Sequence, residues 1–596
     1  MRRLHFAIRT LRMKLLKSLL VVLPLAGLAA CADVPAQTAQ GPGAASVESI
    51  PDANDTGSLY GLFLAGRKAL NDGHGQVAAD YFAKASESDP SATFLRERAF
   101  TAALIAGDVH RAADLAPAAG QASLSVQRLG QLTRAVDALA DGDGHKAQAA
   151  LGPEPLGPPH REASLLLAPW AAASAGDVKA ALTLPDSRGD LLITEVSTLD
   201  LALLSERFHH YDEAEAAFHK LTSGGGTSEA SIIGYGGFLE RRGRRADAQA
   251  LYDTALKVDE ANAPIRAARD RVIAGRPAPP QPTLTQGAAQ ALLAPAAAYF
   301  AERQPELGLT YLRLVLRLDP ARDDAWLLLG DTLVAAGDMD SARRAYDHIQ
   351  SGSPQYVGAR GRLILTYQGP EDAPTALAIA EATVKQEPND DDALALLADS
   401  LRTSEKYDES AKVLDTLIAH QGDHAGWQLY YMRGVALAQA DHWPQAEPDL
   451  KKALALKPDD PEVLNYLGFS WVDRGEHLAE AKEMIEKAAT ARPDSGAIID
   501  SLGWAYFKLG DYKNAVVQLE RAAGLEAADP DINDHLGDAY YRVGRVTEAR
   551  YQWQRVLTLE PSVTLRQQVE MKLKSGPGSP LTDKPANIAA TATHSG

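Results

Sequence analysis

A repeat of about 34 residues runs through the C-terminal half of the chain, and it limits the fold more than any other feature of the sequence. Its first column is mainly glycine, with gaps of 34, 34, 36, 34, 35 and 34 residues between Gly330, Ile364, Ala398, Gly434, Gly468, Gly503 and Gly537. About twelve residues later comes a column that is mainly alanine, formed by Ala342, Ala376, Ser410, Ala446, Ala481, Ala515 and Ala549. A third column is mainly proline, formed by Pro320, Pro354, Pro388, Gly422, Pro458, Pro493, Ala527 and Pro561. A period of this length indicates a stack of similar supersecondary units rather than one globular core.

Between these columns, large apolar residues recur at helical spacing. Leu464, Leu467 and Trp471, for example, stand at i, i+3 and i+7, which places them on one face of a helix. A small residue in one helix and an alanine in the next let the two helices approach closely, and a proline ends the second helix. Each unit is therefore predicted to be a pair of packed helices, and the predicted fold is an all-α helical-repeat solenoid.

The best-conforming units resemble the tetratricopeptide repeat (TPR) family. They read Tyr-Leu-Gly at 466–468, Ser-Leu-Gly-Trp-Ala-Tyr at 501–506 and His-Leu-Gly-Asp-Ala-Tyr at 535–540. The resemblance covers residues 323–561 and, more weakly, 289–320. It implies a superhelix whose concave groove binds peptides or partner proteins. Departures from the family pattern predict less regular packing over residues 357–422, and they stand at Ile364, Ala398, Ser410 and Arg433.

The rest of the chain completes the predicted organisation in two arrays. The predicted segments are a signal peptide (1–30), a flexible tether (31–57), a degenerate TPR-like helical array (58–275), a Pro-rich linker (276–288), the regular array (289–575) and a disordered tail (576–596). The regular array is predicted to end in a capping helix over residues 562–575. Leu565, Val569 and Leu573 lie on one face of that helix, and polar residues lie on the other.

The N-terminus has the layout of a secretory signal peptide. Basic residues precede an uncharged run over residues 18–30, which is too short for a membrane span of about 20 residues. The run ends in Leu-Ala-Ala followed by Cys31, the one cysteine of the chain, and this resembles the lipobox of bacterial lipoproteins. The resemblance implies a lipid on Cys31 that anchors the protein in the envelope of a Gram-negative bacterium. Asp33 stands one place later than the inner-membrane retention signal of that family, which favours the outer membrane, facing the periplasm. The alternative is a free cysteine after an ordinary signal peptide, and Met13 is an alternative start.

Composition and motifs exclude several functional classes. The formal net charge of −18 and the lack of a basic stripe beyond the first 17 residues argue against nucleic-acid binding. One cysteine allows neither an intramolecular disulfide nor a cysteine-based zinc site. The sequence from Asp141 to Gly144 resembles the start of a calcium loop, but glycine stands at position 152, where the final glutamate is needed. The glycines at 224–226 lack the lysine of a phosphate loop, and His209-His210 is interpreted as a turn. No catalytic residue, metal or cofactor is predicted, and the protein is not expected to be an enzyme.

A candidate binding groove follows from the TPR resemblance, because that family lines its inner face with fixed positions of the first helix. In the last three repeats the candidate groove residues are Asn465, Phe469, Asp500, Trp504, Phe507, Lys508, Asp534, Asp538 and Tyr541. An aromatic strip edged with acids suits a peptide or helix with apolar anchors and some positive charge. Only Asn465 and Lys508 match the residues of the family's peptide-carboxylate clamp. The alternative is that these aromatic residues belong to the core, as we expect for Trp471, Tyr506 and Tyr540.

These features predict a lipid-anchored scaffold or adaptor that binds other proteins or peptides of the cell envelope. TPR lipoproteins of this kind assist secretin assembly, outer-membrane protein insertion and peptidoglycan hydrolase recruitment, and the resemblance does not choose among these roles. One alternative is an accessory protein of polysaccharide synthesis or export. Another is a cytoplasmic TPR co-chaperone. A glycosyltransferase would need an α/β domain for which the helical repeats leave no room.

Overall fold

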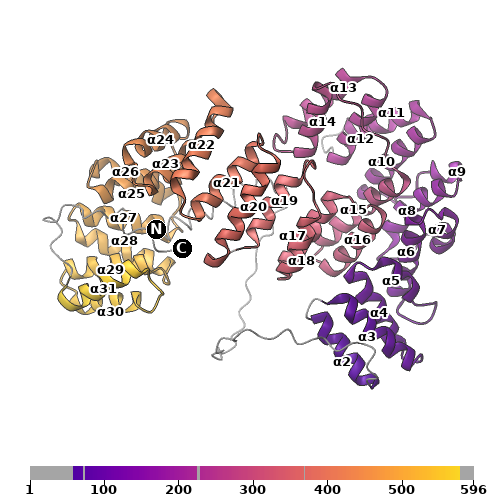
Figure 1. Cartoon of the computed structure of the whole chain (residues 1–596), viewed down its shortest axis with the longest axis horizontal. Helices are drawn as coiled ribbons and strands as arrows, with labels where there is room; N and C mark the ends of the chain where they lie inside the picture. Colours follow the sequence, from indigo (N-terminus) through magenta and orange to yellow (C-terminus); the bar gives the residue numbers. More distant parts are fainter. Residues whose placement is uncertain (1–57, 72–73, 224–227, 368, 577–596) are drawn as a thin grey trace. The chain divides into compact units, whose positions relative to one another are not determined.

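The computed structural model describes residues 58–71, 74–223, 228–367 and 369–576, and every regular element in these ranges is a helix (Figure 1). The predicted all-α fold of paired helices is therefore confirmed. By their contacts the described residues form two units, the N-terminal unit (58–366) and the C-terminal unit (367–576). The predicted signal peptide, Cys31 and its tether, the glycines at 224–226 and residues 577–596 lie outside the described residues. Among the helices that are described, none is long and apolar enough to cross a membrane.

The N-terminal unit is a series of helix pairs. Its helices are α2 (Leu59–Asn71), α3 (Gly75–Ser88), α4 (Thr93–Ala106), α5 (Val109–Leu115), α6 (Leu124–Ala140), α7 (Gly144–Leu151), α8 (Arg161–Ser174), α9 (Val178–Ala181), α10 (Leu191–Arg207), α11 (Tyr211–Thr222), α12 (Glu229–Arg241), α13 (Arg245–Leu256), α14 (Ala263–Ile273), α15 (Leu284–Ala301), α16 (Pro305–Leu318), α17 (Asp323–Ala335), α18 (Met339–Asp347) and α19 (Tyr356–Leu365). Contacts of α4 with α5, α6 with α7 and α8 with α9 continue the pairing through residues 92–198.

The C-terminal unit repeats the same pair more regularly. Its helices are η1 (Pro370–Asp372), α20 (Ala373–Gln386), α21 (Asp391–Thr403), α22 (Tyr407–Gln421), η2 (Gly422–His424), α23 (Trp427–Gln439), α24 (Trp443–Leu456), α25 (Pro461–Arg474), α26 (Leu478–Ala491), α27 (Gly496–Lys508), α28 (Tyr512–Leu525), α29 (Pro530–Arg542), α30 (Val546–Val556) and α31 (Val563–Ser575). The predicted capping helix is present as α31, with Leu565 and Val569 buried. Ser562 starts it by accepting a hydrogen bond from the backbone N–H of Leu565 at 3.0 Å.

Close helix contact explains the glycine column. A Cβ atom at Gly503 would lie 2.6 Å from Cγ of Leu519 on the partner helix, and one at Gly537 would lie 2.5 Å from the indole nitrogen of Trp553. In each case the obstructing residue stands sixteen positions after the glycine, where the second helix crosses the first. The predicted reason for the small residue, close approach of the two helices, is confirmed.

We therefore expect Gly503→Ala to destabilise the C-terminal unit by about 1–3 kcal/mol, because the new methyl group overpacks the contact with Leu519. The matched control is Gly524→Ala in α28, where a Cβ atom meets nothing within 4 Å. That change should stabilise the unit by about 0.5–1 kcal/mol, since alanine is the better helix former. Urea unfolding of both variants measures the difference, and equal effects would contradict the packing account.

In three repeats, an aromatic side chain of the first helix donates a hydrogen bond to the second helix of the preceding repeat. The three bonds run from Trp471 Nε1 to Glu447 at 3.0 Å, from Tyr506 Oη to Glu486 at 2.9 Å, and from Tyr540 Oη to Glu520 at 2.7 Å. The same three carboxylates pair with Lys451, Lys482 and Arg545. Trp471, Tyr506 and Tyr540 are thus structural residues, as the sequence predicts.

Two of the residues that depart from the repeat pattern form local hydrogen bonds. Arg433 donates two hydrogen bonds of 2.7 Å to the largely buried carboxylate of Asp449. Ser410, in the alanine column, donates to the carbonyl of Ala398 at 2.7 Å. The division between the two units, after Thr366, falls within the region where less regular packing is predicted.

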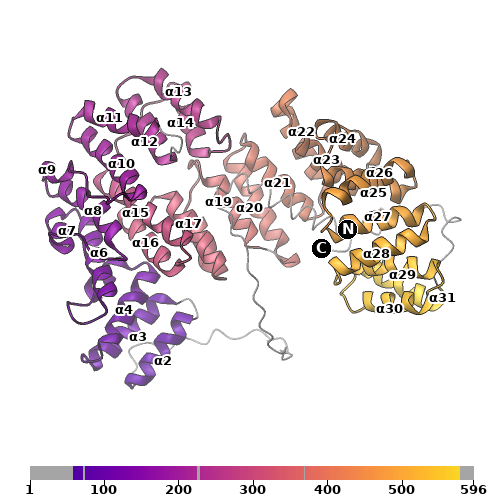
Figure 2. The same ribbon diagram turned by 180° about the vertical axis from the view of Figure 1, so that it is seen from behind.

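In the N-terminal unit the pair α15–α16 lies against the first helices of earlier repeats (Figures 1 and 2). Helix α15 contacts α8 and α10, and α16 contacts α4, α5 and α6. Arg317 of α16 donates to Asp137 at 3.0 Å, Arg313 donates to the carbonyl of Ile105 at 3.0 Å, and fully buried Tyr311 bonds His160 at 2.8 Å. The chain therefore covers the first helices of its own N-terminal repeats.

The Pro-rich stretch before α15 is hydrogen-bonded along the N-terminal unit. Arg241 donates to the carbonyl of Pro279 at 3.1 Å, Arg207 donates to that of Pro282, and Arg245 donates to that of Arg276 at 3.1 Å. This stretch lies inside the N-terminal unit, whereas the contacts divide the chain after Thr366. The domain limits drawn from the sequence stay a prediction.

Asp200 of α10 is a fully buried carboxyl group, and neither of its oxygens has a hydrogen-bond partner. Burial raises the pKa of Asp200 well above its usual range, and the nearby indole of Trp170 lowers this pKa only in part. The folded chain therefore holds this proton more tightly than the unfolded chain, so the stabilising effect is complete at acid pH and is lost as the pH rises through the folded-state pKa. We expect Asp200→Asn to raise the melting temperature more at pH 7.5 than at pH 4.5. A pH-independent difference would show that Asp200 does not titrate in this way.

Candidate partner-binding surface

The predicted groove residues all lie on three consecutive first helices, α25, α27 and α29. These helices contact one another directly, α25 with α27 and α27 with α29, and α31 follows α30 at the end of the series. We call this set of four helices the first-helix layer. The structure therefore brings the nine predicted residues together on one layer, but it gives them different surroundings.

Two of the predicted aromatic residues stack with a histidine that the sequence analysis did not single out. The Trp504 ring stacks on Phe507, with centroids 4.6 Å apart, and on His535, with centroids 4.0 Å apart. His535 Nδ1 lies 3.1 Å from both carboxylate oxygens of Asp500, which is fully buried. Phe507 is also buried, within the core of the last repeats. Asp500 and Phe507 thus have partners inside the chain, whereas Trp504 stays partly exposed.

The other two acids of the predicted groove share one lysine. Lys572 of α31 donates to Asp534 and to Asp538 at 2.8 Å each, and Trp553 donates to Asp538 at 3.2 Å. Burial, together with the charge of Asp538, raises the pKa of Asp534 to about 7, and the ammonium of Lys572 opposes this rise. The two carboxylates raise the pKa of Lys572 despite its burial. Lys572 stands 34 residues after Asp538, so the repeat period could have pointed to this contact.

Asn465 and Phe469 of α25 each have a group that the rest of the chain does not fully engage. Asn465 is buried, and its side-chain oxygen has no hydrogen-bond partner. Phe469 is partly exposed and lies one helical turn further along the same face. Asn465 and Phe469 therefore differ from the acids of the predicted groove, which are held within the chain, and Trp504 is partly exposed although it also packs against the core.

The last two predicted residues are Lys508 and Tyr541. Lys508 is exposed, 3.9 Å from Asp473, and its ammonium lies 5.5 Å from the centroid of Trp504. Tyr541 is partly buried against Trp553, with ring centroids 5.8 Å apart.

One group of side chains in the described part of the chain has the geometry of a metal site. His110, Asp137 and Asp141 offer ligand atoms within 4.8 Å of one another. However, Arg317 donates to Asp137 at 3.0 Å and to Asp141 at 2.6 Å, so a guanidinium already occupies the space between these two carboxylates. Asp137 also bonds His110 and thereby raises the pKa of this histidine. This arrangement serves to hold α16 against α6.

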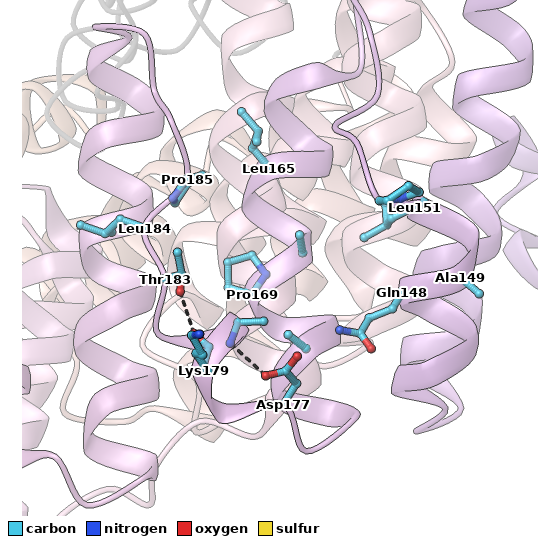
Figure 3. Close-up of a pocket in the computed structure, with 15 residues that line it drawn as sticks. Gln148, Ala149, Leu151, Leu165, Pro169, Asp177, Lys179, Thr183, Leu184 and Pro185 are labelled. Carbon is cyan, nitrogen blue, oxygen red and sulfur yellow. Dashed lines mark hydrogen bonds between the residues drawn. The ribbon is translucent and has the colours of Figure 1, made fainter.

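A pocket of about 800 Å³ lies between α7, α8 and α9 of the N-terminal unit (Figure 3). Leu151, Leu165 and Pro169 form much of its apolar wall. Two of its polar side chains are engaged locally, because Asp177 accepts from the backbone of Ala180 and Thr183 donates to a carbonyl one turn earlier. Among the described lining residues, no buried side-chain polar atom lacks a hydrogen-bond partner.

Comparison with known proteins identifies the repeat. Residues 283–561 match the family model described as tetratricopeptide repeat. No curated protein matches the chain. Among solved structures, a tetratricopeptide repeat protein from Parabacteroides merdae is 14% identical, with a TM-score of 0.36, over 42% of this chain and 97% of that one. The APC/C hetero-tetramer Cut9–Hcn1 is 16% identical, with a TM-score of 0.36, over 86% and 96%. MamA from Desulfovibrio magneticus is 19% identical, with a TM-score of 0.26, over 28% and 93%.

Proposed function

Because residues 283–561 are a tetratricopeptide-repeat array, we propose that this chain is a scaffold that binds other proteins through the first-helix layer of its C-terminal unit. Arrays of this repeat generally mediate protein–protein interactions and are typically non-catalytic. Stacked repeats offer an extended surface on which a peptide or helix can lie.

The observation that carries the proposal is the pair Asn465 and Phe469. A buried acceptor without a donor costs about 1–3 kcal/mol, and an N–H group from a bound partner would remove that cost. Phe469, on the same face of α25, offers an apolar anchor point, and Trp504 on α27 offers a second. A partner that supplies an N–H donor and an apolar side chain fits this surface.

The N-terminal unit is the less favoured binding surface. Its first helices α4, α6, α8 and α10 are in contact with α15 or α16 of the same chain. The net charge of −18 favours partners with basic segments, since charge complementarity speeds association.

We further propose that a lipid on Cys31 anchors the scaffold in the cell envelope, at the outer membrane and facing the periplasm. The support is the sequence around Cys31 alone, which lies outside the described residues. Labelling cells with a palmitate analogue tests this proposal. The full chain should be labelled and its Cys31→Ser variant should not. A label that persists in the variant would contradict the anchor at Cys31, and an unlabelled wild type would favour a cytoplasmic co-chaperone.

The binding function is tested by a crosslinked pull-down from the native cells with two baits. One is the full chain, and the other ends at Thr366, between the units. A cut at the end of the predicted Pro-rich linker (276–288) is unsuitable, because it removes most of α15 and all of α16 and exposes the helices that they cover. The proposal predicts a partner that only the full chain captures. Capture of the same partner by the shorter bait would place recognition in the N-terminal unit.

A further inference from the structure

The last described helix, α31, buries few apolar side chains. Of its 13 residues, Leu565 and Val569 are buried, while Val563 and Met571 are each 60% exposed. Its main helix neighbour is α30, and the described chain ends one residue after it. Because only two apolar side chains of α31 are buried, its apolar packing is weaker than that of the core helices, which open last.

Lys572 gives α31 a specific contact with α29. Leu565, Val569 and Lys572 stand at i, i+4 and i+7, so one face of the helix carries two apolar residues followed by a cation. The ammonium bonds both Asp534 and Asp538 at 2.8 Å, and it is largely buried between them. Two aspartates one helical turn apart on α29 thus accept hydrogen bonds from the lysine of another helix.

The charges of this contact are not balanced. Two carboxylates face one ammonium, and both acids are more than nine-tenths buried. Partial compensation comes from the indole N–H of Trp553 and from the raised pKa of Asp534. The acid pair would therefore attract any helix that delivers a lysine in the same position, since buried carboxylates strongly favour a cationic partner.

We propose that Asp534 and Asp538 form a lysine-binding site for a partner helix, and that α31 occupies this site until such a helix displaces it. The partner helix carries two apolar residues four positions apart and a lysine three positions after the second. This inference rests on the proposed function, because it assigns a partner chemistry to the same first-helix layer. The seated α31 defines that chemistry.

The test uses a fluorescein-labelled synthetic peptide of residues 562–576 and the full-length chain. In the chain variant Val569→Asp with Lys572→Gln, α31 loses both an apolar contact and its lysine, which leaves the acid pair vacant. The peptide should bind this variant at least ten times more tightly than it binds the wild-type chain. Changing the peptide by Lys572→Gln should weaken binding at least tenfold, whereas Lys574→Gln, at an exposed position, should leave it unchanged.

Equal binding to both chains, or binding that ignores the peptide's Lys572, would overturn the proposal. If the double variant does not fold, hydrogen exchange of the wild-type chain tests whether the peptide displaces α31. Added peptide should then speed exchange in residues 563–575 while α29 stays protected, and unchanged exchange in α31 would overturn displacement. A wild-type chain that dimerises through Lys572 would show that the occupant is a second copy, which also contradicts a partner helix.

This experiment is separate from the test of the scaffold function. Failure of the peptide to bind, together with partner capture by the full chain alone, would refute the lysine site and leave the scaffold function standing. Capture by the N-terminal unit alone, together with peptide binding, would refute the proposed partner surface and leave the lysine site standing.

Discussion

Replacement of Arg241 by methionine is expected to lower the free energy of unfolding of the N-terminal unit by about 3–5 kcal/mol, the usual cost of breaking a buried ion pair. Both terminal oxygens of Glu206 accept hydrogen bonds of 2.7 Å from Arg241, and the Glu206 side chain is 2% exposed. Without the guanidinium, this carboxylate would be buried and unpaired. The same guanidinium bonds Pro279, so the change also releases the Pro-rich stretch before α15. Urea unfolding measures the loss.

A neighbouring arginine provides the matched control. Arg244 pairs with Asp247 and Glu215, but the three side chains are between 39% and 54% exposed, so Arg244→Met should cost less than about 1 kcal/mol. The double change Glu206→Leu with Arg241→Met should recover most of the loss, because no buried charge then remains. Equal losses for Arg241→Met and Arg244→Met would show that the Glu206 pair contributes no more than a surface pair.

Phe469→Ala is expected to weaken capture of the protein partner at least thirtyfold, since truncation of a central aromatic anchor typically costs about 2 kcal/mol or more. The melting temperature should stay within about two degrees of wild type, because a partly exposed side chain contributes little to the core. Binding is measured by titrating the captured partner, and stability is measured by circular dichroism on the same samples.

Phe507→Ala is the comparison that separates binding from packing. Phe507 is 8% exposed and belongs to the core of the last repeats, so its truncation should cost about 3–5 kcal/mol of stability. A Phe469→Ala variant that melts as early as Phe507→Ala would place Phe469 in the core. A stable variant with full affinity would remove Phe469 from the binding surface.

Much of the fold can be predicted from the sequence, because most contacts between helices are local and recur with the repeat. Gly503 and Leu519 meet within one helix pair, and the same pair recurs along the array, so a single packing rule predicts many positions. The capping helix is equally local, since Leu565 and Val569 define its buried face without reference to distant residues. The packing of α15 and α16 on α4–α10 is not local. Contacts such as Arg317 with Asp137, 180 residues away, leave no periodic signal.

In the candidate site, too, the sequence does not predict contacts between distant residues. Repeat positions assign Asn465, Asp500 and Asp534 to one layer of helices, but position alone does not tell which groups already have partners. His535 and Lys572 decide this for the acids, and each comes from a later helix. The role of Lys572 could have been inferred from its spacing of 34 residues after Asp538, whereas the stack of His535 on Trp504 depends on side-chain conformations that the repeat does not fix.

The central claim is that the first-helix layer of the C-terminal unit holds the partner. Site-specific photo-crosslinking in the full-length chain tests it most directly, with a benzophenone amino acid placed at Phe469, at Val517 on the second helix α28, or at Leu191 on α10. Val517 and Leu191 are 58% and 83% exposed, so both controls are accessible. The account predicts a crosslinked partner from position 469 and none from positions 517 and 191. Crosslinking from position 191 or 517, with none from 469, would contradict it.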